Sequence, residues 1–266
     1  MDLSWRRFNR RASASRGLVC DSAGDTTAAD IGGLFTKVVS PTRVDTVGGP
    51  ALRFATAQYL ESTVPPVVLM PCTVMAIVSF DAVTDYVYQA IWGAYSTSSN
   101  LIELMAYGSR LGMWVKATGY GGTETLSSSL LVAGRQYVVV GRFTSGVDRS
   151  IWLNGVNVAN STIDQVTAAF TKNTWGAYRE GSVADFLNGN IVLRRAWNRA
   201  LSDQEIYSLS YNTSRPWSIY SQPFVGLAPP TPTLSTSTSA ILPAGVSYMG
   251  SGLTRSIVPA GVGYMG

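Results

Sequence analysis

Residues 17 to about 215 alternate between short apolar runs and turns rich in Gly, Ser and Thr. Many of the runs are dominated by β-branched and aromatic residues, as expected of strands. The clearest are Cys72–Phe80, 86–92, Asn100–Tyr107, Arg110–Lys116 and 137–143. Closely spaced strands separated by such turns are typical of antiparallel sandwiches and barrels. The pattern therefore predicts an all-β fold for this part of the chain.

A β-hairpin is predicted within residues 150–159, which read SIWLNGVNVA. Two apolar runs flank Asn154-Gly155. This pair is favoured in a type I′ turn because both central positions need a positive φ. The hairpin is the clearest local signal in the sequence.

One short helix is predicted near the end of this zone, in the run ALSDQEIYSLSYN. Ser202 suits the N-cap and Glu205 the N3 position, which together form a capping box. Ile206 and Leu209 are spaced to face the core, and Leu201 could act as a hydrophobic staple.

Composition changes at both ends and predicts four regions. A basic arm covers residues 1–16, the folded domain 17–215, a Pro/Ser/Thr-rich linker 216–240 and a duplicated tail 241–266. The tail reads ILPAGVSYMG and then IVPAGVGYMG, which agree at eight of ten positions. Linkers of this composition are extended or flexible.

The duplicated tail is predicted to be an anchor. Ten residues have no room to bury their own apolar side chains, and two copies suggest two equivalent pockets on a partner or on neighbouring subunits of a symmetric assembly. An alternative is that the tail folds back on its own domain. The predicted docking residues are Ile241, Pro243, Val246, Tyr248, Met249, Ile257, Pro259, Val262, Tyr264 and Met265.

The 266-residue chain is 46% hydrophobic and 14% charged, which fits a packed domain. Its net charge of +4 arises in the arm, so the rest is close to neutral and a nucleic-acid-binding body is not indicated. The arm is a solvated tail, or it binds nucleic acid or an acidic protein surface through Arg6, Arg7, Arg10 and Arg11; a protein partner is preferred. The most apolar stretch, residues 64–80, is too short and too rich in proline to span a membrane.

Three segments carry a family resemblance. Residues 149–162 (RSIWLNGVNVANST) and 173–212, which end in NRALSDQEIYSLSYN, resemble the C-terminal half of laminin-G-like, concanavalin-A-like jelly-roll domains. Residues 48–61 (GGPALRFATAQYLE) are similar to an early strand of that family. The resemblance covers about residues 17–213. It implies two antiparallel sheets of six or seven strands each, packed face to face.

A second resemblance concerns origin. Residues 211–224 (YNTSRPWSIYSQPF) are similar to tails that follow such domains in many bacteriophage and prophage proteins. The expected function is a non-enzymatic structural protein of a phage virion, more specifically a capsid decoration protein, assembled in the host cytoplasm. Its partners would be other capsid or tail proteins, in many copies. The alternative is a glycan-binding tail or fibre module that recognises host carbohydrate.

No catalytic residue is predicted. Glycan hydrolases of this fold use a Glu-x-Asp-x-x-Glu arrangement, because two carboxyls must flank the scissile bond. The chain has no such triplet, and Glu103 stands alone in LIELMAY. The sequence has no histidine, which excludes histidine-dependent triads.

No cofactor is predicted, and calcium is left open. The candidate ligands Asp81, Asp85, Asp148 and Asp185 form no dense acidic loop and read more simply as turn residues. The cysteines, Cys20 and Cys72, have no metal-binding spacing. They are interpreted as small buried hydrophobes, with a disulfide as the alternative.

Carbohydrate binding would use exposed aromatic rings. The candidates are Trp92, Tyr95, Trp114 and Tyr120, which lie in or beside the predicted strands. Because half of a sheet's side chains face the core, a core position is as good an interpretation for each. Trp152 and Trp175 are predicted to lie in the core.

Overall fold

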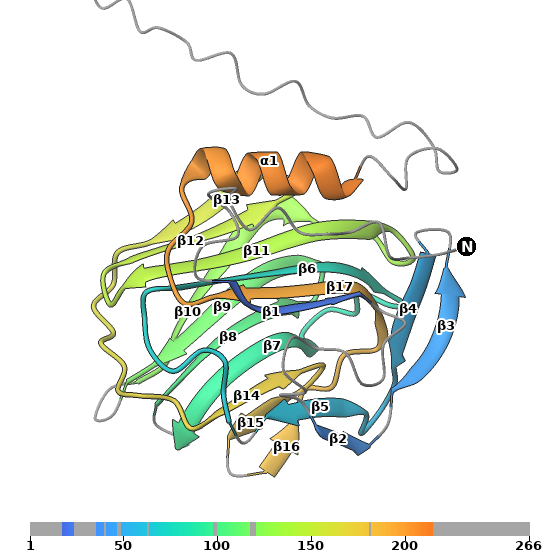
Figure 1. The fold of residues 1–266 in the computed structure, drawn as a ribbon, viewed down its shortest axis with the longest axis horizontal. Coiled ribbons are helices and arrows are strands. Elements are labelled where there is room, and N and C mark those ends of the chain that lie inside the picture. The colour runs from blue at the N-terminus through green and yellow to red at the C-terminus, as the bar shows by residue number, and fades with distance from the viewer. Residues whose placement is uncertain are drawn as a thin grey trace, which may run out of the picture. The chain divides into compact units, whose positions relative to one another are not determined.

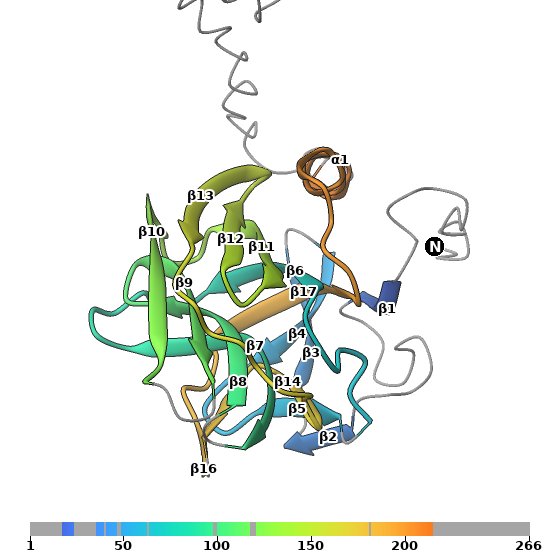
Figure 2. The ribbon, with the colours of Figure 1, turned by 90° about the vertical axis from the view of Figure 1, so that its left-hand side faces the viewer.

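The computed structural model describes residues 18–214 except 24–35, 40, 47–48, 63, 98–99, 118–120 and 181. Within this range the chain forms two large antiparallel sheets packed face to face (Figures 1 and 2). The predicted all-β sandwich with one short C-terminal helix is therefore confirmed. The arm, the linker and the tail lie outside the described residues.

The two large sheets contain eight and seven strands. The eight-stranded sheet has the order β13 (Val156–Ser161), β12 (Asp148–Leu153), β11 (Gln136–Ser145), β6 (Cys72–Phe80), β17 (Gly189–Trp197), β4 (Gly49–Phe54) and β3 (Thr42–Thr46), and β1 (Leu18–Ala23) also pairs with β17. The seven-stranded sheet has the order β10 (Thr123–Leu130), β9 (Arg110–Lys116), β8 (Asn100–Tyr107), β7 (Tyr88–Thr97), β14 (Lys172–Trp175), β5 (Tyr59–Ser62) and β2 (Thr36–Val39). A separate two-stranded sheet joins β15 (Tyr178–Glu180) and β16 (Ser182–Ala184).

The core fills the space between the two large sheets. Alternate residues of each strand point inward, so aromatic and aliphatic side chains from both sheets interdigitate. Trp92 and Trp175 are both fully buried there, with ring centroids 6.4 Å apart. Trp152 is also buried, but in a second cluster on the outer face of the eight-stranded sheet. The prediction of core positions for Trp152 and Trp175 is confirmed.

Most predicted strands occur where the sequence placed them. β6, β8 and β9 have the predicted bounds, and β11 contains the run 137–143. The run 86–92 is different, because β7 begins only at Tyr88. Tyr86 has a φ of 61°, which is incompatible with a strand, and its side chain is 84% exposed. It belongs to the loop that precedes β7.

The Asn154-Gly155 hairpin is confirmed. The two residues have φ values of 53° and 83°, both positive as a type I′ turn requires. The side-chain oxygen of Asn154 also accepts a hydrogen bond from the Val138 amide at 2.9 Å. The turn is therefore tied to β11, the neighbouring strand of β12.

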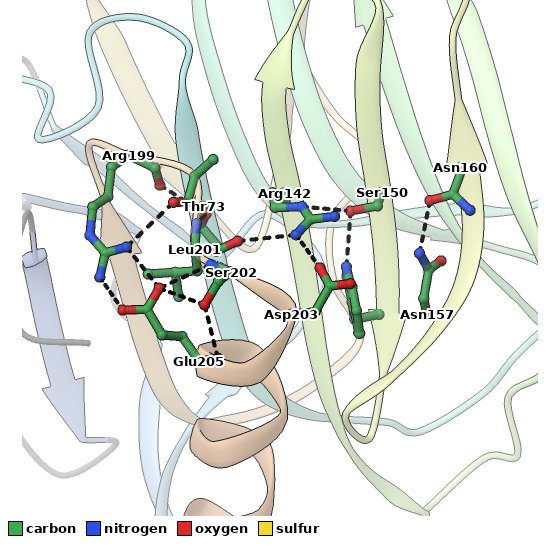
Figure 3. Close-up of polar contacts among 12 residues, drawn as sticks. Thr73, Arg142, Ser150, Asn157, Asn160, Arg199, Leu201, Ser202, Asp203 and Glu205 are labelled. Atoms are coloured by element: carbon green, nitrogen blue, oxygen red, sulfur yellow. Dashed lines mark hydrogen bonds and ion pairs between the residues drawn. The ribbon is translucent and has the colours of Figure 1, made fainter. Parts of the chain in front are cut away.

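The helix α1 (Asp203–Ser214) packs on the outer face of the eight-stranded sheet (Figure 2). Its capping box is formed as predicted: the Glu205 amide donates to the Ser202 hydroxyl at 3.3 Å, and the Ser202 amide donates to the Glu205 carboxylate at 2.9 Å (Figure 3). Arg199 pairs with the same carboxylate at 2.8 Å. Ile206 and Leu209 of the helix and the preceding Leu201 are buried between the helix and the sheet, which confirms the predicted apolar contacts.

Cys20 and Cys72 are both buried and do not form a disulfide, so they are small core residues. Burial raises the pKa of the Cys72 thiol, which keeps it in the neutral form. No helix among the described residues is both long enough and apolar enough to cross a membrane.

Candidate functional site

The outer face of the seven-stranded sheet carries polar and aromatic side chains in register. Residues directly opposite each other in antiparallel strands point to the same face. On this face, one line of opposed residues crosses six strands. It is called the central row and consists of Glu61, Thr174, Gly93, Glu103, Trp114 and Glu124.

An irregularity in β7 decides which of its aromatic side chains reach this face. The register against β8 shifts between Ala90 and Trp92. An extra residue in one strand reverses the alternation beyond it. As a result Ile91 and Trp92 both point into the core, whereas Tyr88 and Tyr95, on either side of the irregularity, both belong to the outer face.

A chain of aromatic rings runs along this face. Tyr86 meets Tyr107 edge to face at 6.3 Å, and Tyr107 stacks on Tyr88 at 4.3 Å. Tyr88 lies 5.8 Å from Trp114, which is parallel to within 12° to Tyr178 at 6.1 Å. We call Tyr86, Tyr107, Tyr88, Trp114 and Tyr178 the aromatic ladder. It runs from an exposed loop residue to the buried Tyr178.

The exposed end of the ladder is held by a loop that docks on the β8–β9 turn. The Gly108 amide donates to the Val87 carbonyl at 3.0 Å, and the Val87 amide donates to the Thr84 carbonyl at 3.3 Å. Gly108 has a φ of 55°, and a side chain there would press on the backbone of Asp85. The turn thus needs glycine both for its conformation and for the close approach of the loop.

The buried end of the ladder, Tyr178, comes from a segment far from the other rings in the sequence. The Gly176 amide donates to the Ile91 carbonyl at 3.1 Å, and the Ala90 amide donates to the Asp185 carbonyl at 2.8 Å. These bonds lie on either side of the β15–β16 hairpin and bind it to β7. Tyr178 is thereby packed with Ala90, Tyr95 and Leu101 on the outer face.

Three carboxyl groups lie around the ladder. Glu103 is 1% exposed, Asp185 is half-buried and Glu124 is exposed. Burial raises the pKa of Glu103 well above its usual range, and the negative charges of Asp185 and Glu124 raise it further. Burial also raises the pKa values of Asp185 and Glu124, although a hydrogen bond from the Tyr88 hydroxyl opposes the shift at Glu124.

Burial and the same negative charges also raise the pKa of Tyr88. Burial, followed by the charge of Glu124, raises the pKa of the Tyr88 hydroxyl to about 12. The hydroxyl therefore keeps its proton at neutral pH and donates a hydrogen bond to the Glu124 carboxylate. This contact links an aromatic ring of the ladder to the exposed carboxylate.

The other end of the central row is already paired. Lys172 contacts the Glu61 carboxylate at 2.8 Å, and the Tyr95 hydroxyl donates to it at 2.7 Å. In contrast, the Glu103 carboxyl has a buried oxygen, Oε1, with no hydrogen-bond partner in the part of the chain that the structure describes. Two acids of the row therefore differ in chemistry: Glu61 forms an ion pair, whereas Glu103 has a buried oxygen without a partner.

The four aromatic residues proposed from the sequence have different positions. Trp92 is 0% exposed and belongs to the core, so its assignment to a glycan site is wrong, and the irregularity in β7 is the reason. Tyr95 lies on the outer face but is buried, with its hydroxyl bonded to Glu61. Trp114 is half-buried in the middle of the ladder. Tyr120 lies outside the described residues.

The remaining predicted residues are not brought together. All of the arm contacts and tail docking residues lie outside the described residues. Of the acids considered for calcium, Asp81 forms an ion pair with Arg53, and Asp185 joins the outer face. Among the described residues, no three acidic or cysteine side chains are grouped so as to hold a metal ion.

Sequence analysis missed Tyr88, Tyr107, Tyr178, Glu103 and Glu124 as members of one site. A lone acid in an apolar strand was the available signal for Glu103. Nothing in the sequence indicated that Tyr178 would stack on Trp114, because the two are far apart in the chain and belong to different sheets.

The chain is similar to a known protein family and to several solved structures. The model of the family described as "Concanavalin A-like lectin/glucanases superfamily" matches residues 54–207. No curated protein sequence matches the chain. Among solved structures, domain 4 of AbnA, a GH43 extracellular arabinanase from Geobacillus stearothermophilus in complex with arabinotriose, is similar with a TM-score of 0.61 at 14% identity, covering 73% of this chain and 98% of that domain.

Two botulinum neurotoxin structures are also similar. The binding domain of botulinum neurotoxin DC in complex with SialylT has a TM-score of 0.58 at 11% identity, covering 76% of this chain and 52% of that one. The same domain in complex with rat synaptotagmin II has a TM-score of 0.58 at 10% identity, covering 74% and 52%. At these identities the similarity shows a shared fold.

Proposed function

Because the chain belongs to the concanavalin A-like lectin/glucanases superfamily, we propose that its sandwich is a non-catalytic glycan-binding module. The binding surface is the outer face of the seven-stranded sheet. The observation that carries the proposal is the aromatic ladder, which lies on the same face as Glu103, Glu124 and Asp185.

Aromatic rings and carboxyls together match the chemistry of a sugar. One side of a pyranose ring is lined by C–H groups, which pack on the face of Tyr or Trp, and its hydroxyls hydrogen-bond to carboxylates at the ring edge. Tyr and Trp also provide large contact areas at a small cost in side-chain entropy. Trp114 is half-buried between Glu103 and Glu124 in the central row, so it offers both kinds of contact.

The similar structures support a ligand-binding role. The arabinanase domain is described in complex with arabinotriose, and the neurotoxin domains are described as binding domains. What those proteins bind does not identify the ligand of this chain. It does make a ligand-binding role for the shared fold the simplest hypothesis.

A glycan array with the full-length chain tests this function. We expect binding to at least one glycan class, and we expect Trp114→Ala to weaken it at least tenfold, because loss of one ring–sugar contact removes about 1.4 kcal/mol or more. Tyr211→Ala is the control, since it removes a 44%-exposed aromatic ring of α1, which packs on the other sheet.

The same samples separate binding from hydrolysis. Thermal melting verifies that both variants are folded, and an assay for new reducing ends follows the bound glycan over time. Equal loss of binding in both variants, or no binding to any glycan, would refute the assignment of the site. New reducing ends would refute the non-catalytic role.

We also propose that the chain is displayed on a bacteriophage virion, as a capsid decoration protein docked through its tail. The supporting observations are the duplicated decapeptides of 241–266 and the similarity of 211–224 to phage protein tails. In this hypothesis residues 1–16 and 241–266 contact virion proteins, in many copies, and 17–215 face outward. The glycan would then be a host surface carbohydrate.

Truncation at Gly226 tests the anchoring role. We expect the full-length chain to associate with purified particles and the truncated chain to be lost from them, while both bind glycan equally. If the truncated chain is incorporated as well as the full-length chain, the tail is not the anchor.

A further inference from the structure

Glu103 is a buried acid on the outer face with an unsatisfied oxygen. Its carboxyl lies on β8 among apolar residues, it is 1% exposed, and Oε1 has no hydrogen-bond partner among the described residues. Leaving a buried carboxyl unpartnered costs folding free energy, so most buried acids are paired or hydrogen-bonded. Its position at the centre of the sheet points to a ligand as the missing partner.

The charged groups that act most strongly on Glu103 are both negative. Its nearest charged neighbours are Asp185 and Glu124, which also carry raised pKa values. Within the described part of the chain, no ion pair joins any of these three carboxyls to a lysine or arginine. Glu61, in the same row, shows the contrast because Lys172 neutralises it.

The three carboxyls lie at different depths on the outer face. Glu103 and Glu124 are the residues on either side of Trp114 in the central row, so their backbones are separated by two strand spacings, about 10 Å. Asp185 comes from the loop after β16 and is held over β7 by its carbonyl. A sugar ring stacked on Trp114 would therefore have carboxyl groups at its edges.

We propose that this site binds glycans that contain free amino sugars, and that its carboxyls receive the protonated amines of these sugars. Glu103 forms the floor of the site, Asp185 a wall and Glu124 the exposed rim. The exposed parts of the aromatic ladder contact the sugar rings. The proposal rests on the glycan-binding function and names the substrate class for it.

An ammonium group fits this site better than other glycan substituents. A cation gains from each carboxyl in a poorly solvated site, where charge pairs are stronger than in water. A uronic or sialic acid would be repelled by the same charges. An N-acetyl group is uncharged and larger, so it leaves the carboxyls without a counter-charge.

The aromatic ladder favours a glycan over a basic peptide as the ligand. Four rings, Tyr107, Tyr88, Trp114 and Tyr178, follow one another at centroid distances of 4.3, 5.8 and 6.1 Å, and the parts of them that other rings leave uncovered provide an aromatic surface for sugar units. A lysine side chain would use the carboxyls but few of these rings. The outcome with a lysine peptide is therefore part of the test.

The test compares two oligosaccharides that differ only in their amine. Calorimetry on the full-length chain, at about pH 6 so that the amines are protonated, measures affinity for a tetramer of glucosamine and for the matching tetramer of N-acetylglucosamine. We expect at least a tenfold preference for the glucosamine tetramer. Glu103→Gln, which keeps the shape of the side chain, should reduce that preference at least fivefold.

Two further variants complete the design. Asp185→Asn removes a second carboxyl and suits its backbone, because asparagine tolerates the φ of 50° at this position; it should reduce the preference as Glu103→Gln does. Asp45→Asn makes the same change of charge on an exposed side chain of β3 and should leave the preference intact.

The outcomes separate the proposal from the function on which it rests. Equal or tighter binding of the acetylated tetramer, or a preference that survives both site variants, overturns the amino-sugar assignment while leaving glycan binding intact. Binding of tetralysine as tight as that of the glucosamine tetramer also overturns it. If no glycan of any class binds, the proposed function itself fails.

Discussion

Replacing Glu103 with glutamine should change how stability depends on pH. In the folded protein the pKa of Glu103 is raised by burial and by neighbouring negative charge, whereas in the unfolded chain it is close to about 4.3. Between these two values the folded state holds a proton that the unfolded state has released. The free energy of unfolding therefore falls as pH rises through this window.

One proton sets the size of the effect. While Glu103 is protonated in the folded state and ionised in the unfolded state, the free energy of unfolding falls by up to about 1.4 kcal/mol per pH unit. For a domain of this size that corresponds to roughly 3–6 °C in Tm per pH unit. Glutamine does not titrate, so Glu103→Gln should lose this dependence and be more stable than the parent at neutral pH.

The assay is urea denaturation followed by tryptophan fluorescence, at steps from about pH 4 to about pH 8. Asp185 and Glu124 contribute a slope of the same sign in the parent, because their pKa values are also raised. The difference between Glu103→Gln and the parent isolates Glu103, and Asp45→Asn is the control for a change of charge on an exposed side chain. A difference that stays constant with pH would refute the inference that Glu103 is buried without a counter-charge.

Three other changes test the packing of the sandwich. Trp92→Ala should lower the free energy of unfolding by about 3–5 kcal/mol, because the side chain is fully buried between the sheets; a loss below about 1 kcal/mol in urea denaturation would contradict its core position. Ser202→Ala should cost about 1 kcal/mol by removing the N-cap of α1, and unchanged Tm would argue against the capping box. Gly176→Ala should lower Tm more than Gly134→Ala does: both have positive φ, but only at Gly176 would a Cβ overlap the Phe54 ring. Equal shifts in Tm would show that backbone conformation alone accounts for the effect.

Local signals in the sequence determined the elements of this fold. The bounds of β6, β8 and β9 follow from runs of β-branched and aromatic residues between turns. Asn154-Gly155 requires a turn with two positive φ values, and Ser202 with Glu205 caps a helix within a few residues. Such features depend on neighbours close in the chain, so they do not need the partner strands to be known.

The site was decided by tertiary structure, because the direction of a side chain depends on strand register. One irregularity in β7 sends Trp92 into the core and leaves Tyr88 on the outer face, and no local signal in the strand distinguishes the two rings. Pairing of β8 with β9 sets Glu103 beside Trp114, and the docking of the β15–β16 hairpin adds Tyr178 from another sheet. The unsatisfied state of Glu103 likewise depends on which distant side chains surround it: Lys172 reaches Glu61, whereas Glu103 has acids for its nearest charged neighbours.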